Sequence, residues 1–242
     1  MSKIILEILT VLVIAVLPQV LNSFYPQEWK DLLAKFPANW RSASAFFSRI
    51  GMILLALYIF ANHLNGYHII GLTIREIQSF PTLLTAGGLT IYLSLIFVFS
   101  RLRSQKTKQE IAIRQERTLA VLRYAPNAGF WKSLPSFVDI WLAVLGEELI
   151  YRGYFVLLLG AVTGTFVPWV LLSITLSILV HLYQGLTLKV ALGHAILAAI
   201  FITAILITKS LFAAIIPHLV YDTIWLIRAL RSTPKEEAPS PS

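Results

Sequence analysis

The sequence predicts an all-α protein, a polytopic membrane helix bundle of about seven transmembrane helices, within a range of six to eight. Hydrophobic residues make up 57% of the chain and charged residues 13%, about half the charged share of an ordinary soluble domain. Several apolar stretches approach the roughly 20 residues that a helix needs to cross a hydrocarbon core. These stretches are continuous rather than alternating, which favours helices over the closed barrel that lipid would also accept.

The apolar stretches are separated by polar segments that divide the chain. The seven expected spans cover about residues 4–20, 46–62, 82–100, 137–160, 165–184, 188–208 and 211–229. The first contains Glu7 and ends at Pro18, so we expect a span or an interfacial helix there. We therefore predict an N-terminal span with an amphipathic surface segment (1–45), a membrane bundle (46–231) whose functional core is 137–229, and a disordered tail (232–242).

The basic residues predict the orientation of the bundle. Placing the long polar loop 101–135 in the cytoplasm puts sixteen of the twenty Lys and Arg residues on that side and only Lys3, Arg75 and Lys209 on the other. Cytoplasmic loops carry such an excess of Lys and Arg. We therefore expect an integral, multi-pass protein of the cell membrane, with this loop cytoplasmic.

The same topology accounts for the net charge of +8. The basic residues face anionic lipid headgroups, so we expect the lipid bilayer as a partner and no nucleic acid. The chain contains no cysteine, which excludes disulfides and thiolate chemistry. The sequence carries no signal for the oligomeric state.

Charged and histidine side chains interrupt three of the expected spans. Glu147, Glu148 and Arg152 lie in the fourth span, His181 in the fifth, and His218 with Asp222 in the seventh. One charged side chain near the bilayer centre costs about 2.5–3.5 kcal/mol on insertion scales, so such residues usually pair and mark functional sites. Glu148 with Arg152, and His218 with Asp222, are pairs four residues apart that share a helix face.

These residue types suit the hydrolysis of an amide bond. A carboxylate partly removed from water can accept a proton near neutral pH, and a neighbouring histidine can hold the water or protonate the leaving nitrogen. A second histidine can stabilise the tetrahedral oxyanion. The same set, namely Glu147, His181, His218 and Asp222, could instead bind a divalent metal such as zinc, and the residue types alone do not choose between the two.

The three motifs resemble those of the CAAX protease and bacteriocin-processing (CPBP) family, which includes the type II CAAX prenyl endopeptidases. The resemblance covers about residues 137–229 and comprises Glu147-Glu148-x-x-x-Arg152, His181 followed by Leu-Tyr-Gln-Gly, and His218-x-x-x-Asp222. The family's second motif usually has phenylalanine four residues before its histidine, where this chain has Ser177.

The resemblance implies an intramembrane endopeptidase that acts on a membrane-anchored protein or peptide, of which a CAAX-like substrate is one form. Glu147 would activate water with the help of His181, Glu148 and Arg152 would fix the site, and His218 with Asp222 would bind the scissile carbonyl. The family is commonly called a metalloprotease, yet some members look like metal-independent glutamate proteases. The chain lacks a His-Glu-x-x-His motif, and the prediction leans toward water activated by Glu147 and His181.

Other interpretations use the same residues. The Glu148–Arg152 pair could serve only to lock one helix, the His218–Asp222 pair only to fix helix packing, and His181 could be interfacial. His194 matches no motif and is expected to hydrogen-bond between helices or to line the cavity. A non-catalytic membrane scaffold or immunity-type protein would keep the fold without needing these residues, and a small proton-coupled carrier would also place them at mid-membrane.

Overall fold

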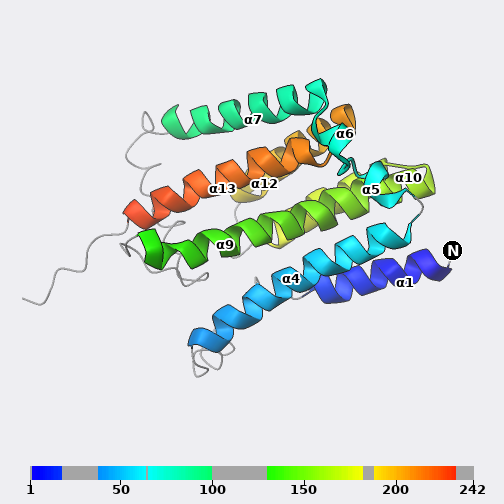
Figure 1. The fold of residues 1–242 in the computed structure, drawn as a ribbon, viewed down its shortest axis with the longest axis horizontal. Helices are drawn as coiled ribbons and strands as arrows, with labels where there is room; N and C mark the ends of the chain where they lie inside the picture. Colours follow the sequence, from blue (N-terminus) through cyan, green and yellow to red (C-terminus); the bar gives the residue numbers. More distant parts are fainter. Residues whose placement is uncertain (1, 18–37, 64, 100–129, 182–187, 233–242) are drawn as a thin grey trace, which may run out of the picture.

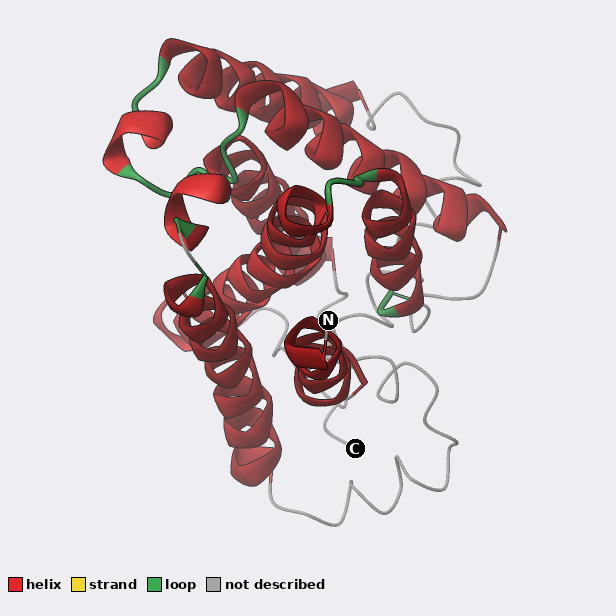
Figure 2. Cartoon of the chain, turned by 90° about the vertical axis from the view of Figure 1, so that its right-hand side faces the viewer, coloured by secondary structure: helices red, strands yellow, loops and turns green. Residues whose placement is uncertain are grey.

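The computed structural model is all-helical over the residues that it describes, which are 2–17, 38–63, 65–99, 130–181 and 188–232. These residues contain no strand (Figure 2). The predicted fold class is thereby confirmed. Much of the surface segment 23–45, most of the polar loop 101–135 and nearly all of the tail from 232 lie outside the described residues, and the expectations for them stay predictions.

The described helices fall where the apolar stretches predict them. In chain order they are α1 (Ser2–Val11) with η1 (Leu12–Val16), α4 (Ala38–Asn62), α5 (Gly66–Ile69), α6 (Ile74–Ile77), α7 (Phe80–Phe99), α9 (Phe130–Glu147) with η3 (Glu148–Leu159) and α10 (Gly160–Thr163), α11 (Val167–Leu179), α12 (Leu188–Thr208) and α13 (Phe212–Ser232). The long helices run side by side, with α7, α13, α9, α4 and α1 in succession across the view of Figure 1.

The helix that continues α9 lies at the centre of the bundle. Every residue of η3 is buried, and this helix contacts α4, α11 and α12. A helix that is apolar nearly all round is expected at such a position. The π-helical geometry begins at Glu148, and π-helical turns are rare and recur at functional sites.

The number of membrane crossings is not confirmed at seven. Among the described residues, only α12 is by itself long and apolar enough to span a membrane, with a mean hydropathy of 2.5. The stretch 46–62 passes the same test only together with 66–77, from which it is bent by 111°. The apolar parts of α7 and α11 are shorter, whereas α9, η3 and α13 contain the charged residues of the candidate site, which lower their apolarity.

The outward faces of the helices are nevertheless apolar. Large hydrophobic side chains are exposed along several of them, including Leu83, Leu84, Ile91, Tyr92 and Leu95 of α7 and Leu188, Leu192, Ile196 and Ile207 of α12. Such extensive exposed apolar surface is unusual for a soluble monomer. Lipid is the solvent that suits it.

The first helix is tied to the bundle through its only charged interior residue. Glu7, which weakened the prediction of a first span, accepts a hydrogen bond from Nε2 of His63 at 2.8 Å. His68 likewise pairs with Glu76 at 2.6 Å. Both histidines are structural partners of carboxylates.

A second tie joins the turn after α5 to the start of α13. The amide of Leu211 donates to the carbonyl of Ile70 at 3.0 Å, and the hydroxyl of Ser210 donates to the carbonyl of Gly71 at 3.0 Å. Gly71 has a φ of +64°, and a Cβ there would lie 2.0 Å from the backbone oxygen of Lys209. Glycine is required at this position by both the backbone conformation and the close approach.

Candidate functional site

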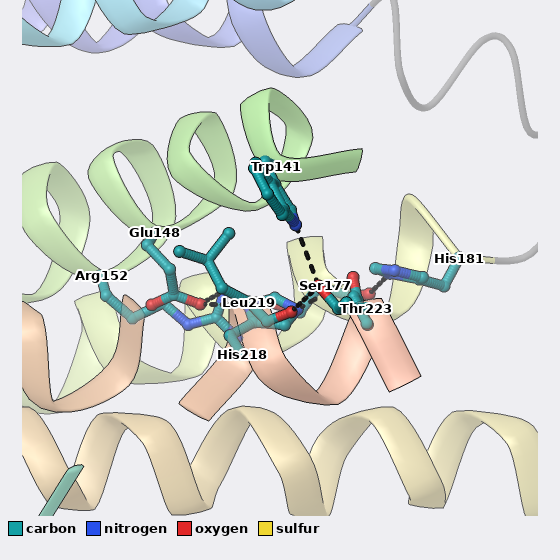
Figure 3. Close-up of polar contacts among 9 residues, drawn as sticks. Trp141, Glu148, Arg152, Ser177, His181, His218, Leu219 and Thr223 are labelled. Atoms are coloured by element: carbon teal, nitrogen blue, oxygen red, sulfur yellow. Dashed lines mark hydrogen bonds and ion pairs between the residues drawn. The ribbon is translucent and has the colours of Figure 1, made fainter. Parts of the chain in front are cut away.

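Glu148 is the point at which the polar residues of two helices meet. It is the first residue of η3 and is fully buried. Its Oε1 accepts a hydrogen bond from Nδ1 of His218 on α13 at 2.7 Å and lies 3.3 Å from a guanidinium nitrogen of Arg152 (Figure 3). The predicted Glu148–Arg152 pair is therefore present, and it is joined to the third motif by a contact that the sequence did not predict.

Arg152 is the buried cationic partner of Glu148. Its side chain is 4% exposed, and its contact with Glu148 is an ion pair rather than a well-aligned hydrogen bond. The guanidinium carbon lies 5.9 Å from the ring centroid of Phe201 on α12. The same ring packs against His218 with 5.0 Å between centroids. Phe201 thus covers both cationic partners of Glu148, a role for which the apolar pattern of α12 gave no signal.

His218 bridges two carboxylates. A carboxylate can only accept, so Nδ1 of His218 carries the proton that is donated to Glu148. Nε2 then faces Asp222 one turn further along α13, with 3.6 Å between Nε2 and the nearer carboxylate oxygen. The residues Arg152, Glu148, His218 and Asp222 therefore form a continuous chain of alternating charge type through the interior.

Glu147 has surroundings different from those of its neighbour, as its position 100° around the helix predicts. It is the last residue of α9, is half-buried, and makes no hydrogen bond or ion pair with the residues that the structure describes. Its charge is nevertheless close enough to interact with His218 and Asp222. Of the two adjacent carboxylates, Glu148 is therefore paired with His218 and Arg152, whereas Glu147 is half-buried and has no direct partner among the described residues.

His181 lies just beyond the end of its helix rather than within a span reaching residue 184. α11 ends at Leu179, and the amide of His181 bonds to the carbonyl of Ile178 at 3.1 Å. The imidazole Nδ1 then donates to the carbonyl of Ser177 at 2.8 Å (Figure 3). The side chain of His181 thus caps a carbonyl that the tightened last turn leaves open.

The capping bond fixes the tautomer of His181, because a carbonyl oxygen only accepts. Nδ1 carries the proton, and in the neutral ring Nε2 is the nitrogen that can accept one. His181 interacts electrostatically with Asp222, so the earlier end of α11 does not remove it from the other motifs. The structure brings Glu147, Glu148, Arg152, His181, His218 and Asp222 into one region of the bundle.

Two site residues were missed or undervalued by sequence reasoning. One is Phe201, and the other is His194 on α12, whose ring stacks on that of His181 with 4.2 Å between centroids and 24° between planes. The expectation that His194 hydrogen-bonds between helices did not include this face-to-face contact. The signal available in the sequence was only a histidine in an otherwise apolar helix.

Ser177 accounts locally for the departure from the second motif. Its side chain is buried, and its hydroxyl has no hydrogen-bond partner among the described residues, as is also true of Ser173 one turn earlier. The contact with His181 uses the backbone carbonyl of residue 177. Any residue at this position could provide that carbonyl, so the substitution leaves the cap of α11 intact.

The side chains of the site do not form a metal-binding arrangement. No group of three or more His, Asp or Glu residues converges as metal ligands within the described part of the chain. Oε1 of Glu148 and Nδ1 of His218 are already bonded to each other, and Nδ1 of His181 is bonded to a backbone carbonyl. These bonds occupy Nδ1 of each histidine and not Nε2, as in zinc-binding histidines whose other nitrogen donates to a carboxylate or carbonyl. The ligand set of Glu147, His181, His218 and Asp222 is not gathered in this geometry of the described residues, and its binding of a metal stays a prediction.

Comparison with known families identifies the region that contains the site. Residues 129–224 match the family model described as type II CAAX prenyl endopeptidase Rce1-like. The match includes all six residues predicted for the site, and it confirms the resemblance seen in the three motifs. Neither the curated proteins nor the solved structures include a significant match to the chain.

Proposed function

We propose that the chain, of which residues 129–224 match the Rce1-like family model of type II CAAX prenyl endopeptidases, is a membrane-embedded endopeptidase. In this proposal it hydrolyses a peptide bond in a membrane-associated protein or peptide. The family acts on prenylated substrates of that kind, so a prenylated CAAX sequence is the first substrate to consider.

The observation that supports the proposal most is the buried chain from Arg152 through Glu148 and His218 to Asp222. A single ion pair suffices to lock a helix, and burying further charges adds desolvation cost. This series of paired side chains continues across two helices. It ends beside Glu147, a half-buried carboxylate that has no direct partner among the described residues. A polar arrangement that stops at an accessible acid is typical of a catalytic site rather than of packing.

Glu147 is the general base of the proposed mechanism. A water held between Glu147 and Nε2 of His181 gives its proton to the carboxylate as its oxygen attacks the scissile carbonyl carbon. The proton on Glu147 is then transferred to the leaving nitrogen as the carbon–nitrogen bond breaks. No step requires a group other than these side chains and water.

His218 supplies the stabilisation of the tetrahedral oxyanion. Glu148 accepts a hydrogen bond from Nδ1 and so holds the imidazole in one orientation, while Arg152 balances the charge of Glu148. In its protonated form the ring also carries a proton on Nε2, which is the hydrogen that it donates to the oxyanion. A donor that is already oriented before the reaction costs no reorganisation in the transition state, and losing one such donor costs about 2.7–4 kcal/mol of transition-state stabilisation. Asp222 keeps Nε2 of His218 turned toward the region that Glu147 and His181 share.

The proposal is tested by cleavage with purified full-length protein in detergent. The substrates are a prenylated CAAX reporter peptide and a library of membrane peptides, each with and without a chelator. We expect wild type and the control Glu76→Gln, whose carboxylate lies on α6 outside the site, to cleave, and Glu147→Gln to lose at least a hundredfold in kcat.

Equal cleavage by Glu147→Gln and wild type would refute the assignment of Glu147. A folded wild type that cleaves neither substrate set would refute the endopeptidase itself and favour a scaffold or carrier. Loss of cleavage on chelation, restored by zinc, would contradict the metal-free mechanism while leaving the reaction in place.

A further inference from the structure

We propose that His194 is a positioning residue of the site, which holds the imidazole of His181 in its working orientation. The inference rests on the proposed function, because it assigns His194 a role in the reaction that His181 assists. No motif contains His194, and it reaches the site from α12, the helix that also supplies Phe201.

The geometry of the two rings defines what His194 can do. Their centroids are 4.2 Å apart and their planes differ by 24°, so the rings lie face to face. A proton passing directly between them would need a nitrogen of one ring in the plane of the other. The stacked arrangement therefore excludes a direct relay between the two and leaves a mechanical role, in which one flat surface limits the rotation of the other.

His181 needs such a support because of where it lies. It follows the last turn of α11, and the capping bond from Nδ1 to the Ser177 carbonyl at 2.8 Å fixes one edge of its ring to the helix. This bond acts on one edge of the ring and does not by itself set the rotation of the ring about that edge. Contact of its face with His194 restricts that rotation, and with it the direction of Nε2.

The two constraints come from different helices that pack together. α11 supplies the carbonyl and α12 supplies the stacking ring, and these two helices are in extensive contact. Asp222 of α13 interacts with His181 electrostatically. His181 thus contacts its own helix and α12, and it interacts electrostatically with Asp222 of α13. A catalytic group needs such support to stay within about 0.5 Å of its productive position.

Three substitutions on α12 separate stacking from general packing. His194→Phe keeps a flat ring against His181, His194→Ala removes it, and Ile196→Ala is a control on the exposed face of the same helix. With the reporter that wild type cleaves, we expect His194→Ala to lower kcat at least tenfold, which corresponds to about 1.4 kcal/mol, with KM within twofold. His194→Phe should retain kcat within about threefold, and Ile196→Ala should match wild type.

A spectroscopic readout tests the proposal independently of cleavage. In protein labelled with 13C and 15N at histidine, the His181 signals, assigned by their absence in His181→Gln, should report the Nδ1-protonated tautomer in wild type and in His194→Phe. His194→Ala should keep this tautomer through the capping bond, but its ring signals should broaden and shift as the ring samples several orientations.

Unchanged kcat and an unchanged His181 spectrum in His194→Ala would overturn the proposal. Loss of activity in His194→Phe as complete as in His194→Ala would overturn it too, by showing that the imidazole itself is needed. If wild type cleaves nothing, the endopeptidase proposal fails, and the spectra still decide whether His194 orients His181.

Discussion

Replacing Glu148 by glutamine tests the buried chain of charges directly. The substitution keeps the size of the side chain but removes the negative charge that faces both Arg152 and His218. Glu148 is fully buried, and the side chain of Arg152 is 4% exposed, so water cannot replace the lost partner. Among the described residues, Arg152 would keep its contact with the ring of Phe201 at 5.9 Å.

The expected loss of stability follows from this isolation of Arg152. Removing one partner of a buried ion pair costs about 3–5 kcal/mol, because it leaves an uncompensated charge. The glutamine oxygen can still accept the hydrogen bond from His218, which returns about 1 kcal/mol. We therefore expect a net loss of about 2–4 kcal/mol. Replacing both partners, as in Glu148→Gln with Arg152→Met, should recover at least half of that loss because no unpaired charge remains.

The assay is reversible denaturation in detergent, followed by circular dichroism and by tryptophan fluorescence, for wild type, both single variants and the double variant. The interaction energy of the pair is the difference between the double variant and the sum of the singles. A coupling energy below about 0.5 kcal/mol, or a Glu148→Gln variant as stable as wild type, would refute the argument that this ion pair is structurally required.

Three further substitutions test features away from this pair. Asp139→Asn should lower stability by about 1 kcal/mol, since the ion pair with Arg49 joins α4 to α9 but is only partly buried; denaturant unfolding measures it, and a loss above 3 kcal/mol would contradict it. Gly71→Ala should lower stability by about 2 kcal/mol or more, because its Cβ would meet a backbone carbonyl. The control Gly87→Ala in α7, whose Cβ meets nothing within 4 Å, should be neutral or stabilising by up to about 1 kcal/mol. Equal melting temperatures for the two variants would refute the tight turn at Gly71. Ser177→Ala should raise stability by about 1 kcal/mol, because it removes a buried hydroxyl without a partner among the described residues; a clear loss in the same melting experiment would show that the hydroxyl is satisfied.

The helices could be predicted from the sequence because apolar length and helical spacing are local properties. The stretch 188–208 is reproduced at both ends by α12. α11 stops earlier than predicted because the side chain of His181 caps its own helix, and hydropathy does not report a capping bond. α4 starts at Ala38 rather than near residue 46, since the polar segment before the apolar stretch continues the helix. The π-helical geometry from Glu148 has no signal in the residue pattern.

The candidate site could be predicted in its members but not in its connections. Spacing of four residues identifies pairs within a helix, so Glu148 with Arg152 and His218 with Asp222 were found. It does not report which faces of different helices meet, and so the bond from His218 to Glu148 was missed. The contacts of Phe201 and His194 were missed for the same reason.

The two bonds of Glu148 differ greatly in the length of chain that they enclose. Arg152 lies four residues away within the same helix, so this ion pair can form as soon as that segment has been synthesised and can lower the cost of placing two charges in lipid. His218 lies 70 residues away and can arrive only after α11, α12 and the first third of α13 have been made. A chain that ends before α13 would hold the charged pair safely in the membrane while the site stayed incomplete. The Glu148–Arg152 pair can therefore form in the membrane before the reactive centre is assembled.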